Sequence, residues 1–86
     1  MYRLVIVDDE ESSRNALCQY FPWNENGYEV VGQFGDGSTA LDWLKENPVN
    51  VVLCDIVMPD MDGLTLAEEL YNAHSGIRFI LGRSID

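Results

Sequence analysis

Residues 51–64 read VVLCDIVMPDMDGL, an apolar run that stops at Asp55. Extended back to Val49, the run is almost entirely apolar, so we predict a central strand from Val49 to Cys54. Pro, Asp and Gly recur in the residues that follow Asp55, which is typical of a loop. This stretch therefore predicts a buried strand that carries a carboxylate, Asp55, at its C-terminal end.

Three other segments have the apolar, β-branched character of strands. The first, YRLVIV from Tyr2 to Val7, stops at four consecutive acids, residues 8–11. The second is YEVVGQF, from Tyr28 to Phe34, and the last is the short IRFIL, from Ile77 to Leu81. Four strands are thus expected, and the connections between them are long enough for helices.

The first connection predicts a helix. Ser12 and Ser13 favour helix N-termini, so either could help start it, and Pro22 ends it. The apolar residues that recur there at helical spacing are Ala16, Leu17, Tyr20 and Phe21.

Two further helices are expected along the chain. Ser38 is a candidate N-cap for a helix that ends near Asn47 and Pro48. Another helix is expected from Leu64 to about His74. The residues expected to face inward are Ala40, Leu41 and Leu44 in the first of these helices and Leu66, Ala67 and Leu70 in the second.

Strands and helices therefore alternate, in the order β-α-β-α-β-α-β. This order predicts right-handed crossovers and an α/β fold, with helices on both faces of a parallel sheet. In such sheets, ligands bind beyond the C-terminal ends of strands, near the point where the strand order reverses. Asp8 and Asp9 follow the first strand directly, and Asp55 follows the third. If these two strands are neighbours, the three carboxylates meet at one edge.

Three carboxylates in one crevice repel one another strongly unless a cation lies among them. A site of oxygen ligands with open water positions suits Mg²⁺. A carboxylate beside Mg²⁺ can attack phosphorus and form an acyl phosphate. No glycine-rich phosphate loop and no Ser/His/Asp set accompanies these acids, so we expect no enzyme beyond Mg²⁺-dependent self-phosphorylation and dephosphorylation.

The composition narrows the range of partners. The 86 residues include fifteen acidic and five basic ones, for a net charge of −10. We therefore expect no direct binding of nucleic acid, because phosphate neutralisation needs Lys and Arg.

The first apolar run is too short for a signal peptide or a membrane span. Cys18 and Cys54 show no metal or redox spacing, so we expect two buried, reduced thiols in a cytoplasmic protein.

Two motifs resemble those of response-regulator receiver domains: LVIVDDE at residues 4–10 and VVLCDIVMPDMDGL at residues 51–64. The segments FPW, GYEVVGQFGDG and ALDWL also fit this family, and they are most similar to the branch whose full-length members carry an AraC-type DNA-binding domain. The resemblance covers nearly all of the chain. It implies a flavodoxin-like, three-layer fold and a role in two-component signalling.

The resemblance also implies a role for each acid. Asp55 would be the phosphoacceptor and would take a phosphoryl group from a sensor histidine kinase. Asp8 and Asp9 would hold Mg²⁺ beside Asp55, one directly and the other partly through water, with the backbone carbonyl of Val57 as a further ligand. An attached DNA-binding domain would be controlled through dimerisation.

The chain departs from the family pattern at its C-terminal end. A complete receiver has five strands, so residues 1–86 are expected to be a partial domain, truncated after the fourth strand and derived from a longer regulator. No lysine can take the place of the family's lysine, which follows the fifth strand. The family's switch Ser or Thr aligns with Arg83, and Ser84 is one residue later. Three readings stay open: Ser84 used after a one-residue shift, Arg83 acting as a charged donor, or a frayed tail.

The truncation leads to two expectations. The fourth strand becomes a bare sheet edge beside an uncovered apolar face, so we expect self-association or low stability. The missing groups also allow an alternative function, in which the chain is a receiver-like interaction or dimerisation module that is never phosphorylated.

Two other classes fit the residues poorly. Phosphatases of the haloacid-dehalogenase type need an acid two positions after the nucleophile, where this chain has Val57. A calcium-binding loop would need Met58 as its first ligand, and methionine does not bind Ca²⁺.

Overall fold

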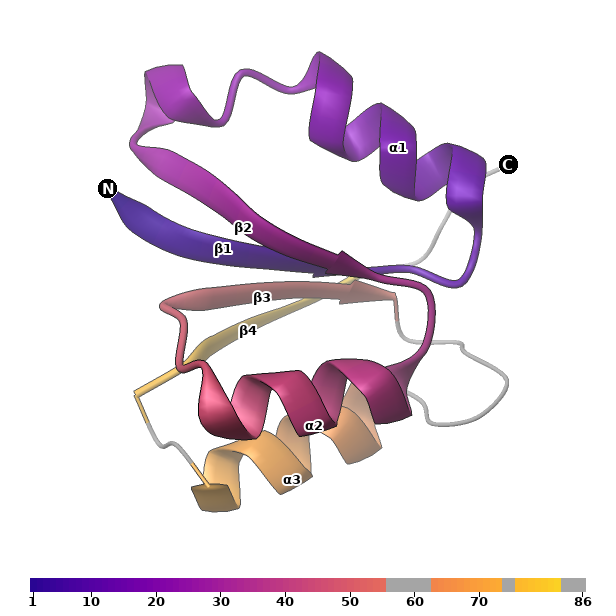
Figure 1. The fold of residues 1–86 in the computed structure, drawn as a ribbon, viewed down its shortest axis with the longest axis vertical. Helices are drawn as coiled ribbons and strands as arrows, with labels where there is room; N and C mark the ends of the chain where they lie inside the picture. Colours follow the sequence, from indigo (N-terminus) through magenta and orange to yellow (C-terminus); the bar gives the residue numbers. More distant parts are fainter. Residues whose placement is uncertain (56–62, 74–75, 83–86) are drawn as a thin grey trace.

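Four parallel strands form one sheet, which the computed structural model shows edge-on in Figure 1. The structure describes residues 1–55, 63–73 and 76–82. The strand order is β2-β1-β3-β4, so β1 and β3 lie in the centre. The strands are β1 (Tyr2–Val7), β2 (Tyr28–Phe34), β3 (Val51–Asp55) and β4 (Arg78–Gly82). All four predicted strands are confirmed, with β3 and β4 displaced by one or two residues from their expected bounds.

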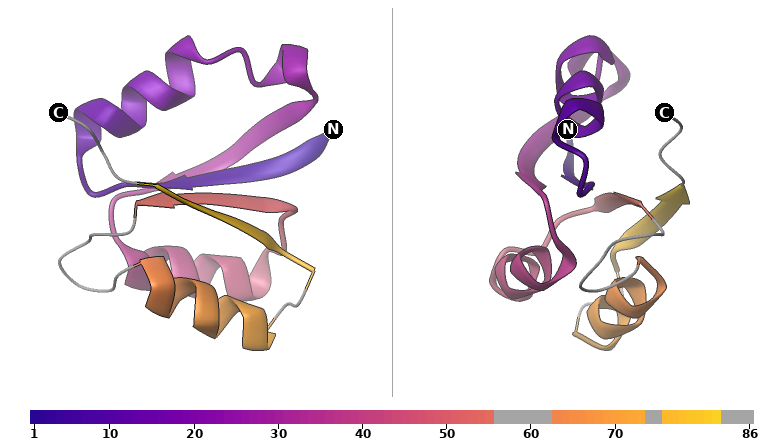
Figure 2. Two further views of the ribbon diagram at one scale, coloured as in Figure 1. Left: turned by 180° about the vertical axis from the view of Figure 1, so that it is seen from behind. Right: turned by 90° about the vertical axis from the view of Figure 1, so that its right-hand side faces the viewer.

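The helices lie on both faces of this sheet and make three layers. Figures 1 and 2 show α1 (Glu11–Tyr20) on one face and both α2 (Gly37–Glu46) and α3 (Gly63–Ala73) on the other. A short 3-10 turn, η1 (Asn24–Asn26), links α1 to β2. The flavodoxin-like α/β architecture expected from the alternating pattern is confirmed.

Helix α1 begins at the last of the four consecutive acids. It starts at Glu11, with Glu10 as its N-cap, and no side chain caps it. Ser12 lies inside the first turn, where its hydroxyl donates to Glu10 Oε1 at 3.1 Å. The helix therefore begins one residue before the two serines, because the chain enters the helix as soon as it leaves the acidic loop.

The predicted start of α2 is wrong, by two residues. Asp36 is the N-cap, and its carboxylate accepts from the Thr39 N–H at 2.7 Å and from the Thr39 hydroxyl at 3.0 Å. Ser38 lies within the first turn instead. Asp caps at least as well as Ser, and here it comes first along the chain, so the helix begins earlier.

The main core lies between the sheet and the α2–α3 layer. Leu44, Leu66 and Leu70 are fully buried there against side chains from β1 and β3. Burial of each such side chain stabilises the fold by about 1.5–3 kcal/mol. The predicted inward residues of α2 and α3 are confirmed, except that Ala67 is only partly buried.

The opposite face is less well covered. Leu4, Ile6 and Val51 are buried there, but α1 contributes no fully buried residue. Of the apolar residues at helical spacing in α1, Leu17 packs against this cluster, whereas Tyr20 remains 82% exposed. Within the described part of the chain, α1 is the only α-helix on this face of the sheet. Part of the apolar surface of this face is therefore exposed to solvent.

Figure 1 shows β4 at the sheet edge beyond β3. On its other side no strand pairs with it among residues 1–55, 63–73 and 76–82. Ile80, in the middle of β4, is 53% exposed. The predicted bare edge is thus present in the described part of the molecule.

None of the helices in that part has the length and apolar character needed to cross a membrane.

Candidate functional site

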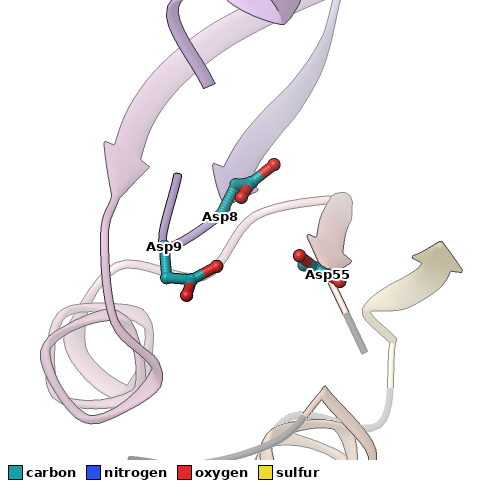
Figure 3. A group of neighbouring side chains, drawn as sticks. All are labelled: Asp8, Asp9 and Asp55. Carbon is teal, nitrogen blue, oxygen red and sulfur yellow. The ribbon is translucent and has the colours of Figure 1, made fainter. Parts of the chain in front are cut away.

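The central pairing of β1 with β3 brings the three predicted acids together. Val7 of β1 is in register with Cys54 of β3, so the next residues, Asp8 and Asp55, leave the sheet side by side. Figure 3 shows the carboxyl groups of Asp8, Asp9 and Asp55 around one common space. A ligand atom from each carboxylate lies within 4.8 Å of the others. The predicted meeting of the three acids is confirmed.

Asp8 is held by contacts to three different segments. Its backbone N–H donates to the Phe34 carbonyl at 3.0 Å, which extends the pairing of β1 with β2 by one residue. Its side-chain Oδ1 accepts from the Glu10 N–H at 2.9 Å. Its own carbonyl accepts from Arg14 Nη1 at 2.8 Å. The position of this carboxyl group is therefore determined by the ends of two strands and the start of α1.

The environment of Asp8 disfavours its ionised form. The side chain is 5% exposed, and this burial is the main cause that raises the pKa of Asp8 above its ordinary value. The hydrogen bond from Glu10 lowers the pKa, while the negative charges of Asp55, Asp9 and Glu10 raise it further. A buried carboxylate among like charges is stabilised by a cation, so the site is poised to bind one.

Asp9 is the most accessible of the three acids. Asp9 is exposed, and Asp55 is the last residue of β3, in register with Gly82 of β4. A crevice of about 170 Å³ opens beside Asp8 and Asp55, and apolar side chains such as Leu17 and Leu53 form its wall. The crevice therefore gives access to the acidic cluster along a largely apolar wall.

The spacing of the oxygens fits a small, hard cation with water among its ligands. Mg²⁺ binds oxygen at about 2.0–2.1 Å, so two ligands on opposite sides of the ion are about 4.2 Å apart. The spread of up to 4.8 Å is slightly larger than that. The three carboxylates are therefore close enough together to be candidate ligands of one such cation. Within residues 1–55, 63–73 and 76–82, this is the one group of three or more acids, histidines or cysteines close enough to share an ion.

Three predicted site residues lie outside the described residues: Val57, Arg83 and Ser84. Their proposed roles stay predictions. The sequence reasoning did not find Arg14, whose guanidinium reaches the Asp8 carbonyl. A basic residue six positions after an acid gives no signal of a bond to a backbone carbonyl, so only the folded structure shows this contact.

Neither cysteine forms a disulfide bond within the described residues. Cys54 is buried in the main core, as predicted, whereas Cys18 is only partly buried on the α1 face. Burial raises the pKa of the Cys18 thiol, and the positive charge of Arg14 partly offsets this effect. The prediction of two buried thiols is therefore correct for one of them.

Known proteins that are similar to this chain in sequence and fold include response regulators. Residues 4–82 match the response regulator receiver domain family. Chemotaxis protein CheY of Bacillus subtilis is 34% identical over 80 residues, which are 93% of this chain and 65% of that protein.

Solved structures of response regulators also resemble this chain in fold. The chain resembles a two component transcriptional regulator AraC from Clostridium phytofermentans, with a TM-score of 0.88 and 29% identity, over 100% of this chain and 69% of that one. It also resembles a CheX-CheY-BeF3-Mg²⁺ complex from Borrelia burgdorferi, with a TM-score of 0.80 and 28% identity, over 93% of this chain and 60% of that one.

The chain spans about two thirds of the length of these three relatives. Together, the β2-β1-β3-β4 sheet, the clustered acids at the ends of β1 and β3, and the match over residues 4–82 lead to one assignment. The chain belongs to the response regulator receiver domain family.

Proposed function

We propose that this receiver domain accepts a phosphoryl group on Asp55 from a sensor histidine kinase, with Mg²⁺ held by Asp8, Asp9 and Asp55 and by the backbone carbonyl of Val57. The observation that carries the proposal is the cluster of three carboxylates within 4.8 Å at the ends of adjacent strands. The CheX-CheY-BeF3-Mg²⁺ complex from Borrelia burgdorferi, which contains Mg²⁺, supports the choice of ion.

The proposed reaction needs little from the protein besides positioning and charge. A carboxylate oxygen of Asp55 attacks the phosphorus atom of a phosphohistidine, and a new P–O bond forms as the P–N bond breaks. The imidazole nitrogen leaves with the bonding electron pair, and Asp55 becomes an acyl phosphate. When bound, Mg²⁺ supplies positive charge for the phosphoryl oxygens. Asp8 and Asp9 hold that ion, and the apolar wall of the crevice limits access of water.

The proposal includes a modest catalytic role for the chain itself. Self-phosphorylation from a small phosphodonor and slow self-dephosphorylation are expected, but no turnover of an external substrate. Because relatives include a transcriptional regulator of the AraC type, we place the chain in cytoplasmic control of transcription through an attached output domain. The net charge of −10 argues against contact with nucleic acid by this segment itself.

The direct test is phosphorylation of the 86-residue chain in Mg²⁺ with acetyl phosphate, followed by intact mass measurement. We expect the mass of one phosphoryl group to be added to the wild type and none to Asp55→Asn. Asp42→Asn, which changes an exposed acid of α2, is the control and should be labelled like the wild type. Labelling of Asp55→Asn at the wild-type level would place the phosphoryl group elsewhere and refute the assignment of Asp55.

One observation favours a second function, that of an interaction module that is not phosphorylated. The outer edge of β4 is unpaired within the described residues, and Ile80 on it is 53% exposed, a surface suited to pairing with another chain. Calorimetric titration with Mg²⁺ separates the two functions. Negligible binding by both the wild type and Asp55→Asn would favour the interaction module over the phosphoacceptor.

A further inference from the structure

Arg14 connects three segments that surround the acidic cluster. The side chain comes from α1, and its Nη1 donates to the backbone carbonyl of Asp8 at 2.8 Å. A methyl group built on Gly35, after β2, would lie 3.1 Å from the same Nη1, so the guanidinium lies directly against that loop. Arg14 is partly buried in this position. It therefore joins the ends of β1 and β2 to the first turns of α1.

The carbonyl that Arg14 contacts belongs to the peptide bond between Asp8 and Asp9. A peptide unit is planar, so fixing its oxygen fixes the orientation of the whole unit. The Asp8 side is already held by the bond from its N–H to the Phe34 carbonyl. The bond from Arg14 holds the other side, from which Asp9 extends, and Asp9 itself is exposed.

We propose that Arg14 is a positioning residue for the cation: it orients the Asp8–Asp9 peptide so that both carboxylates face Asp55. The inference rests on the proposed binding of Mg²⁺ and assigns a role to a residue that lies outside the set of ligands. Partners that orient metal ligands typically change metal affinity about 10–100-fold when they are removed.

A second effect of Arg14 has the opposite sign, which makes the proposal easy to test. A guanidinium near the site repels a divalent cation, so its removal would tighten Mg²⁺ binding if charge were its main contribution. Loss of positioning weakens binding instead. The direction of the change in affinity in Arg14→Ala therefore separates the two roles.

The chain offers a matched control in Arg3. Its Nη1 also donates to a backbone carbonyl, that of Pro48, at 3.1 Å. This bond lies near the start of β1, at the opposite end of the strand from Asp8. Arg3→Ala removes the same charge and the same type of hydrogen bond without touching the acidic cluster.

The experiment measures Mg²⁺ affinity by calorimetry for the wild type, Arg14→Ala, Arg14→Lys and Arg3→Ala, with the melting temperature of each. We expect Arg14→Ala to bind Mg²⁺ about 10-fold more weakly. Arg14→Lys keeps the charge and one donor and should recover part of the affinity. Arg3→Ala should bind as the wild type does. Hydrogen exchange of the Glu10 amide, followed by NMR without Mg²⁺, should speed up in Arg14→Ala only.

Affinity in Arg14→Ala that equals or exceeds the wild-type value would overturn the proposal, as would an equal loss in Arg3→Ala. Failure of the proposed Mg²⁺ binding itself would give a different result. A wild-type chain that binds no Mg²⁺ would refute both the cation site and a role of Arg14 toward it. A wild type that binds Mg²⁺ together with an unaffected Arg14→Ala would refute the role of Arg14 alone.

Discussion

Replacement of Asp8 by Asn should make the metal-free chain more stable and abolish its response to Mg²⁺. Asn keeps the oxygen that accepts the bond from the Glu10 N–H and has nearly the same volume, so the change removes mainly the charge. In the wild type this charge is buried and lies close to those of Asp55 and Asp9. Burial is the main cause that raises the pKa of the Asp8 carboxyl, and these negative charges raise it further. The free energy of unfolding should therefore rise when the charge is lost.

The geometry sets the size of the effect. Two unit charges 4.8 Å apart, the largest separation within the cluster, repel by about 3.5 kcal/mol at an effective dielectric constant of about 20, before screening by salt. Asp9 is exposed and salt screens its contribution, so we expect a gain of roughly 1–2 kcal/mol. For a domain of this size each kcal/mol raises the melting temperature by about 4–8 °C.

The pH dependence has a defined sign. Because the pKa of Asp8 is raised in the folded chain, the folded state binds more protons than the unfolded state between the ordinary and the raised pKa. The stability contributed by protonated Asp8 is therefore full below the ordinary pKa and is lost as the pH rises through the raised one. The difference in stability between Asp8→Asn and the wild type should grow over that range.

Thermal melts in EDTA and in Mg²⁺, at several pH values, measure these effects. Saturation at 100 times the dissociation constant stabilises a protein by about 2.7 kcal/mol, and this increment should appear in the wild type and vanish in Asp8→Asn. Asp42→Asn, on the exposed side of α2, should change neither quantity. Loss of stability in metal-free Asp8→Asn, or an undiminished response of this variant to Mg²⁺, would refute the reasoning.

Two further predictions concern the core and the sheet edge. Leu66→Ala, at a fully buried site, should lower the free energy of unfolding by about 2–5 kcal/mol in urea titrations. Leu64→Ala, on the same helix but 61% exposed, should change it by no more than about 0.5 kcal/mol, and equal losses would contradict the assigned core face. Ile80→Lys places a charge on the open edge of β4 and should reduce self-association in light scattering as the concentration is raised. Tyr71→Lys, at a site on α3 that is 68% exposed, is the control, and an equal effect of both variants would exclude the edge as the interface.

Much of the architecture follows from local sequence patterns. The runs from Tyr2 to Val7 and from Tyr28 to Phe34 are strands with those bounds, because segments rich in apolar and β-branched residues suit a sheet covered on both faces. Leu44, Leu66 and Leu70 are buried as their helical spacing predicts. The helix starts were less predictable, because several residues near each start could serve as the N-cap. Which of them does so depends on the path of the preceding loop.

By itself, the sequence determined where the four strands lie to within one or two residues, which faces of α2 and α3 are apolar, and that acids stand at the ends of the first and third strands. Only the tertiary structure decided that β1 lies next to β3, that this pairing brings Asp8 within reach of Asp55, and that Arg14 returns from α1 to the Asp8 carbonyl. The physical reason is the range of the interactions involved. Hydrophobic periodicity is a property of neighbouring residues, whereas strand order, burial of a charge and its shifted pKa arise from segments far apart in the chain that pack together.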